Sequence, residues 1–210
     1  MNEYYEEILP HLGHDPLWGR NTVRRWKPLL GDDDGRGQAD RHVLVDRYAW
    51  AIPTDEAIAA LAELSPLVEI GAGRGYWAHL LRQAGADIIA YDRQPRGGNV
   101  WHARTTKPWT SVLPGTHRMT IKHPDRALFL CWPPYDNPMA SRALRLYNGS
   151  TVAYVGEGSW GCTADSSFHE ALEVGWRTVR EVTLPQWEGI HDRLTIHKRR
   201  SATTPFTTAP

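Results

Sequence analysis

The stretch that decides the fold is LVEIGAGRGYWAHLLRQAGADIIAYD, residues 67 to 92. It opens with a short apolar run, Leu67 to Ile70, which is bounded by proline and glycine and is typical of a buried strand. A second strand, Ile88 to Tyr91, ends on Asp92. Between the strands, apolar residues recur at helical spacing at Trp77, Leu80, Leu81 and Ala84. The order of strand, glycine-rich turn, helix, strand and acid predicts one half of a nucleotide-binding α/β fold.

The turn between strand and helix holds three glycines on alternate residues, Gly71, Gly73 and Gly75. Because glycine has no Cβ, the backbone here can turn sharply and let a ligand lie against it. The helix N-terminus beyond offers unpaired N–H groups to a negatively charged ligand group. Asp92, at the carboxyl end of the second strand, is placed to accept hydrogen bonds from ribose hydroxyls. The turn therefore predicts a nucleoside ligand.

The kind of nucleoside follows from two residues around the turn. A dinucleotide fingerprint has a glycine where this chain has Tyr76. Glu69 lies two residues before Gly71, and a carboxylate there suits a ligand with a cationic end better than a pyrophosphate. The segment E-I-G-A-G-R-G, with Asp92 about twenty residues on, resembles motif I and the second-strand acid of class I S-adenosylmethionine (SAM) methyltransferases. A ligand-free strand–helix turn and an NAD site remain the alternatives.

The resemblance implies how SAM would be held. Glu69 and residues 71 to 75 would hold the methionine end, and Asp92 would hold the ribose. The segment YAWAIPT, residues 48 to 54, leads into a helix capped by Thr54 and would lie against the ligands, although core aromatics are an equal alternative. The predicted cofactor contacts are Tyr48, Glu69, Gly71, Ala72, Gly73, Gly75, Asp92, Cys131 and Trp132.

A second motif follows the apolar strand Ala127 to Cys131 and reads W-P-P-Y-D, residues 132 to 136. It resembles the (Asp/Asn/Ser)-Pro-Pro-(Tyr/Phe/Trp) motif at the same place in methyltransferases that act on amino nitrogens. There the prolines stiffen the backbone, a polar side chain and a carbonyl accept from the amine, and the aromatic ring stacks on the target. In this chain Trp132 takes the polar position and cannot accept a hydrogen bond from an amine. Carbonyl oxygens and Asp136 remain as acceptors on a rigid aromatic platform, and a plain proline-stiffened strand exit is the alternative.

Loops at the carboxyl ends of the other strands supply the remaining candidates, because such loops contact the ligands in open α/β sheets. Asn99 and His102 follow the second strand, and Glu157 is the first acid past the strand Thr151 to Val155. Cys162 has no partner base at a recognisable spacing, so we do not expect a cysteine nucleophile. The predicted catalytic residues are Tyr135, Glu157 and His102. The predicted substrate contacts are Trp50, Pro133, Pro134, Tyr135, Asp136 and Trp160.

The predicted fold is α/β: a Rossmann-like, seven-stranded, mostly parallel sheet with helices on both faces, as in class I methyltransferases, under an N-terminal helical cover. Two alternating segments, Arg177 to Leu184 and Arg193 to Lys198, predict a final antiparallel pair of strands. At 210 residues the chain fits one domain. We assign residues 1–47 to a cover or lid, 48–200 to the SAM-binding domain, and 201–210 to a disordered tail.

Composition limits the partners. The net charge is zero and the pI is about 7.2, so the chain lacks the basic charge typical of nucleic-acid-binding proteins. No apolar run approaches the roughly 20 residues that span a bilayer, and the N-terminus does not resemble a signal peptide. Two cysteines form neither a disulfide framework nor a zinc site by themselves. We therefore expect a cytoplasmic protein with free thiols, no metal site, no membrane partner and a small-molecule partner.

These patterns lead to one preferred function and two alternatives. The preferred function is methyl transfer from SAM to a nitrogen or oxygen of a small-molecule acceptor held in an aromatic pocket, which fits the neutral charge and the aromatic residues expected around that pocket. An amino-methyltransferase acting on nucleic acid or protein fits the W-P-P-Y motif, but Trp132 opposes it. A catalytically silent SAM-binding regulatory protein would keep the glycine turn without acceptor chemistry.

Overall fold

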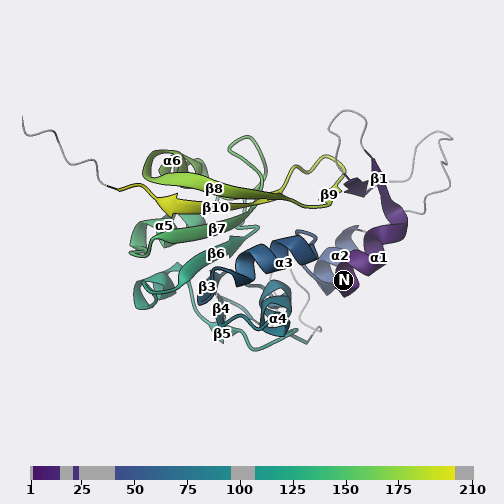
Figure 1. The fold of residues 1–210 in the computed structure, drawn as a ribbon, viewed down its shortest axis with the longest axis horizontal. Coiled ribbons are helices and arrows are strands. Elements are labelled where there is room, and N and C mark those ends of the chain that lie inside the picture. Colours follow the sequence, from purple (N-terminus) through teal and green to yellow (C-terminus); the bar gives the residue numbers. More distant parts are fainter. Residues whose placement is uncertain (1, 15–20, 24–40, 96–106, 202–210) are drawn as a thin grey trace, which may run out of the picture.

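The computed structural model describes residues 2–14, 21–23, 41–95 and 107–201. Its centre is a seven-stranded sheet in the order β5-β4-β3-β6-β7-β10-β8, which runs from the bottom to the top of Figure 1. The strand β10 is antiparallel to β7 and β8, and the other neighbours are parallel. The strands are β3 (Leu67–Ile70), β4 (Ile88–Asp92), β5 (Leu113–Pro114), β6 (Ala127–Cys131), β7 (Thr151–Gly156), β8 (Trp176–Thr183) and β10 (Arg193–Arg199). The predicted Rossmann-like, mostly parallel sheet is confirmed.

Helices cover both faces of this sheet. One face packs against α3 (Asp55–Ala62) and α4 (Tyr76–Gln83). The other packs against α5 (Met139–Leu146) and α6 (Ser166–Gly175), with the 3-10 helix η2 (His117–Lys122) beside α5. Along β3, Leu67 joins the first core and Val68 the second. Because side chains alternate along a strand, Glu69 points to the α3–α4 face.

Local contacts define the ends of three elements. The hydroxyl of Thr54 accepts the Ala57 N–H at 3.1 Å and caps α3, as predicted. Pro138 is the N-cap of α5, and the Asn137 side chain accepts the Met139 N–H at 3.1 Å. The strand β5 is limited to Leu113–Pro114, and just before it the Thr110 hydroxyl and the Ser111 carbonyl accept hydrogen bonds from Arg82.

The N-terminal part of the chain forms more structure than the sequence suggests. It contains α1 (Glu3–Ile8), the 3-10 helix η1 (Leu9–His11), β1 (Leu12–His14), β2 (Asn21–Val23) and α2 (Arg41–Arg47). The strand β2 pairs with β1 and, in parallel, with β9 (Gln186–Trp187), which gives a second, three-stranded sheet. The predicted tail lies outside the described residues except for Ser201.

Tyr76, which takes the place of the third fingerprint glycine, connects this N-terminal part to α4. Its buried hydroxyl accepts the Tyr4 N–H at 3.1 Å and donates to Asn2 Oδ1 at 3.2 Å. The Asn2 amide in turn donates to the Pro53 carbonyl at 2.9 Å. The residue that excludes a dinucleotide fingerprint thus fastens α1 beside the glycine turn.

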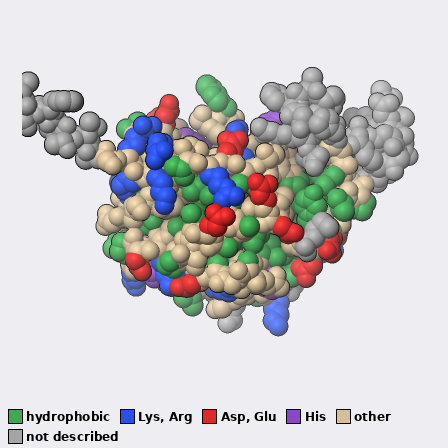
Figure 2. All heavy atoms as spheres, in the orientation of Figure 1, with side chains coloured by type: hydrophobic (Ala, Val, Ile, Leu, Met, Phe, Trp, Pro, Cys, Tyr) green, Lys and Arg blue, Asp and Glu red, His purple; other side chains and the backbone are tan. Residues whose placement is uncertain are grey.

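The surface in Figure 2 is mixed in character, with acidic and basic side chains among apolar areas. Lys and Arg side chains gather at the left of this view, over the ends of β8 and β10. Arg180 pairs with Glu63 at 3.0 Å, and Arg193 pairs with Glu181 at 3.2 Å. None of the described helices has both the length and the apolar character needed to cross a bilayer.

Candidate functional site

A cavity of about 1010 Å³ lies at the carboxyl ends of the central parallel strands. This edge of an open α/β sheet is where ligands bind, and the volume is at the upper end of the roughly 300–1,000 Å³ typical of small-molecule sites. The cavity brings together most of the predicted site residues. Those that line it are Tyr48, Trp50, Glu69, Gly71, Ala72, Gly73, Asp92, Cys131, Trp132, Pro133, Pro134 and Tyr135.

The glycine turn and Asp92 form one hydrogen-bonded unit in this cavity. The Gly73 N–H donates to Asp92 Oδ2 at 2.9 Å, and the Gln94 N–H donates to Oδ1 at 2.7 Å. A carboxylate has about four acceptor positions, so roughly two remain for a ligand. Gly71 and Ala72 both donate to the Tyr91 carbonyl, which holds the turn across the end of β4.

Gly75 has a different place from the other turn glycines. It is the N-cap of α4 with a φ of 79°, and it is absent from the described lining of the cavity. A Cβ at this position would lie 2.6 Å from Cγ2 of Val112. Glycine is therefore required at position 75 because of the positive φ and the crowding by Val112, and not because of contact with a ligand.

The cavity lining contains buried polar atoms that the described structure leaves without a hydrogen-bond partner, among them Oε2 of Glu69, Nε1 of Trp77 and Nε of Arg74, whose other two nitrogens donate to backbone carbonyls. Glu69 and Trp77 are 1% and 2% exposed. The pKa of Glu69 is raised to about 8, chiefly by burial, with the charge of Arg82 lowering it and the charge of Asp92 raising it. Trp77 occupies a position that the sequence pattern assigns to the core of a helix. The lining therefore combines an unsatisfied carboxylate acceptor, Glu69 Oε2, with an unsatisfied indole donor, Trp77 Nε1.

Two stacked tryptophans form an aromatic wall of the cavity. The Trp50 and Trp132 ring centroids are 5.2 Å apart, with an interplanar angle of 20°. The Arg41 guanidinium lies 5.1 Å from the first ring and 5.5 Å from the second. Trp132 has a φ of 49°, and its backbone N–H donates to the Val155 carbonyl at 2.8 Å. This hydrogen bond fastens the start of the W-P-P-Y-D motif to the end of β7.

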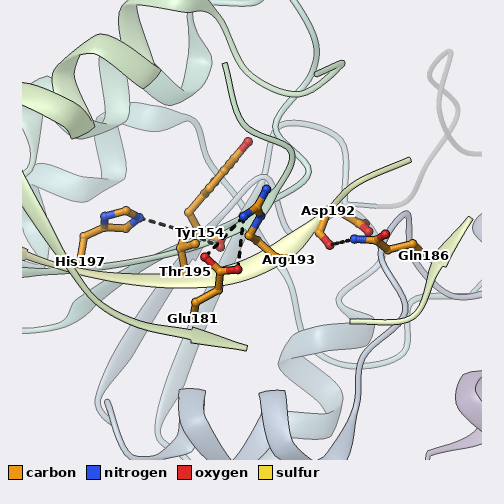
Figure 3. A network of polar contacts seen from close by, with 7 residues as sticks. All are labelled: Tyr154, Glu181, Gln186, Asp192, Arg193, Thr195 and His197. Carbon is orange, nitrogen blue, oxygen red and sulfur yellow. Dashed lines mark hydrogen bonds and ion pairs between the residues drawn. The ribbon is translucent and has the colours of Figure 1, made fainter. Parts of the chain in front are cut away.

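Asp192, which the sequence did not indicate, fixes the Trp132 ring. Its Oδ2 accepts the indole N–H at 2.8 Å, while Oδ1 has no hydrogen-bond partner among the described residues. The side chain is 1% exposed, and burial raises its pKa to about 7. The Gln186 amide donates to the Asp192 carbonyl at 2.8 Å, and Figure 3 shows this contact just before β10.

The rest of the W-P-P-Y-D motif is fastened to the loop after β7. The Pro133 carbonyl accepts the Ala164 N–H at 2.9 Å, and Asp136 donates its N–H to the Ala164 carbonyl at 3.0 Å. One of the carbonyl acceptors expected for an amine is therefore already engaged. Asp136 is exposed and is absent from the described cavity lining. Tyr135 lines the cavity and is 66% exposed, which places it at the opening.

The predicted residues of the β7 loop lie in positions that do not favour contact with a substrate. Glu157 is buried, with Oε2 accepting the Cys162 N–H at 2.7 Å and Oε1 accepting the His191 N–H at 2.8 Å. Burial alone would raise its pKa, but these hydrogen bonds outweigh burial and lower it. Trp160 is fully exposed, and neither residue is in the described lining. Glu157 therefore joins the loop after β7 to the loop before β10 through these two hydrogen bonds.

Two further candidates, Asn99 and His102, lie outside the described residues. Within residues 2–14, 21–23, 41–95 and 107–201, no group of three His, Cys, Asp or Glu side chains is placed to hold a metal ion.

Arg74, a residue of the glycine motif, lines the cavity although it was not among the predicted site residues. Its buried guanidinium donates to the carbonyls of Asp46, of Arg47 at 3.1 Å and of Lys107 at 2.8 Å. It therefore ties the end of α2 to the turn. The arginine in G-A-G-R-G was the available signal. Other lining residues that were missed are Arg41, Arg93, Thr116, His117, Met139, Arg142, Cys162 and Ile190.

Comparison with known proteins gives structural likenesses alone. No family model and no curated protein matches the chain. MtNAS in complex with MTA and tNA shares 12% identity with a TM-score of 0.43 over 68% of this chain, which spans only 57% of that protein. Magnesium protoporphyrin IX methyltransferase (ChlM) from Synechocystis PCC 6803 with bound SAM shares 14% with a TM-score of 0.45 over 78% of this chain and 86% of that one. A mutant 16S rRNA (adenine(1408)-N(1))-methyltransferase from Catenulisporales acidiphilia shares 10% with a TM-score of 0.39, over 72% and 94%. At this level of similarity, the chemistry has to be argued from the site.

Proposed function

We propose that the cavity binds SAM and that the chain transfers the methyl group to a nitrogen or oxygen of a small-molecule acceptor. SAM supplies a methyl group on a sulfonium centre, from which a neutral thioether leaves without needing a proton. The observation that carries the proposal is the pair of unsatisfied buried atoms, Glu69 Oε2 and Trp77 Nε1, in the lining of one cavity. An α-amino acid end offers the complement of this pair, an ammonium donor and a carboxylate acceptor.

The energetics of burial support this assignment. A buried polar group without a partner costs about 1–3 kcal/mol, so a ligand that satisfies both atoms recovers that cost on binding. A ligand ammonium beside Glu69 would also favour the ionised carboxylate over the protonated form that burial favours. A pyrophosphate would place negative charge beside the same carboxylate, so the NAD alternative is disfavoured.

At the ribose end, Asp92 is held by two backbone N–H groups and keeps acceptor capacity for hydroxyl donors. Its partner Gly73 lies in the turn that follows Glu69. The two carboxylates therefore flank the turn, one for the cationic end of the ligand and one for its sugar. Tyr48, which also lines the cavity, would contact the same ligand beside the turn.

The acceptor would lie against the Trp50–Trp132 wall, with Pro133, Pro134 and Tyr135 bounding the opening. Methyl transfer is an in-line displacement, and orientation alone supplies up to roughly 7–11 kcal/mol of the barrier. We assign Tyr135 and the tryptophan wall to this positioning. A general base is needed only for an acceptor of high pKa, and the hydrogen bonds of Glu157 make it a poor one.

Calorimetry with S-adenosylhomocysteine tests the cofactor assignment. We expect the wild type to bind, and Glu69→Gln and Trp77→Phe each to weaken binding by about tenfold or more, because each variant leaves one ligand charge unpaired. Matched controls are Glu170→Gln on the exposed side of α6 and Trp176→Phe, a buried tryptophan of β8 outside the cavity lining. Equal affinities for the wild type and both site variants would contradict the proposal.

A second experiment addresses the acceptor. Protein incubated with methyl-labelled SAM and separate metabolite, protein and nucleic-acid fractions should transfer label to the metabolites. Label in protein or nucleic acid would instead favour the amino-methyltransferase of macromolecules. Binding of the cofactor without transfer to any fraction would favour the silent SAM-binding protein.

A further inference from the structure

The described arginines differ in how their side chains are satisfied. Most form ion pairs with carboxylates or donate hydrogen bonds, among them Arg47, Arg74, Arg126, Arg180, Arg193, Arg199 and Arg200. The side chains of Arg93, Arg118, Arg142, Arg145 and Arg177 have neither within the described residues. Apart from Arg177, which lies on β8, these arginines come from three neighbouring elements: the end of β4, η2 and α5.

These elements meet at one part of the cavity. The helix α5 packs against η2, and Arg93, His117 and Arg142 all line the cavity. His117 is half-buried, and its pKa is lowered first by burial and then by the charges of Arg142, Arg118 and Arg145. Three guanidinium groups therefore act on one imidazole, and no carboxylate is among the groups that shift its pKa. Such a like-charged cluster is stabilised by an anion.

The strand order places this cluster away from the aromatic wall. His117 follows β5 and Trp132 follows β6, and β4 and β3 lie between those strands. Three strand spacings correspond to about 14 Å. The cavity of about 1010 Å³ contains both ends. Glu69 on β3 lies between the two ends, and Arg93, which directly follows Asp92, places the cationic end next to the proposed ribose site.

We propose that His117, Arg93 and Arg142 form a subsite for a carboxylate or phosphate group of the methyl acceptor. The assignment of this group to a methyl acceptor rests on the function proposed above, whereas the anion subsite itself rests on the arginines that line the cavity. Guanidinium groups bind carboxylate and phosphate through paired N–H donors. The acceptor is then an elongated molecule with an aromatic part against Trp50 and Trp132 and an anionic group at the other end of the cavity.

A single anionic group fits this subsite better than a polynucleotide does. Nucleic-acid-binding surfaces extend basic charge along the strand they bind, whereas the net charge of this chain is zero. Arg93, His117 and Arg142 line the cavity, where a small ligand reaches them, and both arginines are exposed at its edge. Arg118 and Arg145 are exposed on the same elements outside the described lining and reinforce the positive potential.

Nuclear magnetic resonance titration of the full chain tests the subsite. The probes are inorganic phosphate and benzoate, each added to protein saturated with S-adenosylhomocysteine, and the readout is the His117 ring signal. We expect both anions to shift the signal and raise the His117 pKa. We expect Arg142→Gln to weaken phosphate binding about tenfold, and Arg177→Gln, an exposed and likewise unpaired arginine on β8, to leave it unchanged. Calorimetry should give the same S-adenosylhomocysteine affinity for all three proteins.

Three results would overturn the proposal. The first is equal phosphate affinity in the wild type, in Arg142→Gln and in a second variant, His117→Gln. Because His117→Gln lacks the imidazole ring, phosphate binding to it is followed by backbone amide signals. The second is mutual exclusion of phosphate and S-adenosylhomocysteine, which would assign the cations to the cofactor. The third is binding of a short oligonucleotide that is tighter than binding of phosphate and that is weakened equally by Arg118→Gln, Arg145→Gln and Arg142→Gln. If S-adenosylhomocysteine fails to bind the wild type but phosphate still titrates His117, the subsite stands and the proposed function fails.

Discussion

The backbone N–H of Gly73 donates a 2.9 Å hydrogen bond to Oδ2 of Asp92, which joins the glycine turn to the end of the neighbouring strand. Asp92→Ala removes this contact and the proposed ribose acceptor together. We expect the dissociation constant for S-adenosylhomocysteine to rise about 10- to 100-fold, since hydrogen bonds to charged groups contribute about 1.5–3 kcal/mol. Calorimetry measures this change, and Asp125→Ala, at an exposed aspartate before β6, is the control. Similar affinities in both variants would remove Asp92 from the site.

The stability of the ligand-free protein should depend on the charge of Glu69. Its pKa is about 8 in the folded protein, against 4.5 for an ordinary glutamate, because burial penalises the carboxylate. Between these values the folded state binds more protons than the unfolded state, so the stability from Glu69 is present below pH 4.5 and is lost as pH rises towards 8. Glu69→Gln should therefore raise the free energy of unfolding at pH 8, relative to its effect at pH 5, by up to a few kcal/mol.

Urea unfolding of the wild type and Glu69→Gln at the two pH values measures this difference. Glu170→Gln, whose glutamate is exposed on α6, controls for the loss of one negative charge. A pH dependence of stability that is the same in wild type and Glu69→Gln would show that Glu69 does not titrate in this range. The same substitution should strengthen the fold at high pH and weaken cofactor binding, which separates its two roles.

Two glycines with similar positive φ angles allow the effects of backbone conformation and of crowding to be measured separately. Gly75 and Gly85 have φ angles of 79° and 82°. A Cβ would lie 2.6 Å from Val112 at Gly75 and would meet nothing within 4 Å at Gly85. We expect Gly85→Ala to cost about 1–2 kcal/mol from the left-handed backbone alone. Gly75→Ala should cost about 1–3 kcal/mol more because of the clash, and urea unfolding that gave equal losses would contradict this.

The hydroxyl of Tyr76 should hold the N-terminal part of the chain. Tyr76→Phe leaves the Tyr4 N–H and the Asn2 side chain without this partner, at a cost of about 1–3 kcal/mol for the buried groups. We expect faster amide hydrogen exchange in residues 3–8, with little change in α5. Tyr5→Phe, at a partly exposed ring of the same helix, is the matched control. Unchanged exchange in Tyr76→Phe would show that other contacts hold α1.

The main sheet was predictable from the sequence because its signals are local. The central strands are largely apolar runs, of which β3, β4 and β7 end at or next to a glycine or an acid, and the glycine turn fixes how β3 leads into α4. The small sheet was not predictable, since β2 and β9 contain two or three residues each and are separated by most of the chain. Strands this short show no alternation that a pattern could detect.

The site was predictable where a functional residue and the motif that identifies it belong to the same segment of the chain. Glu69, the turn and Asp92 belong to one stretch and lie together in the cavity. Asp192 was missed because it is 60 residues from Trp132, in a loop without a motif. Trp77 was missed because its spacing fits a helix core, and only the structure shows that its indole N–H has no partner and that the residue lines the same cavity as Glu69.

The left-handed backbone of Trp132 offers a starting point for protein engineering. Asparagine tolerates this conformation better than most residues with a side chain, so Trp132→Asn would relieve the backbone while opening the aromatic wall. The exchange also introduces an amide oxygen at the first position of the Pro-Pro-Tyr segment. Because Asp192 would lose its indole donor, Asp192→Asn is a suitable companion change. The double variant would be a template for retargeting the cavity towards amines.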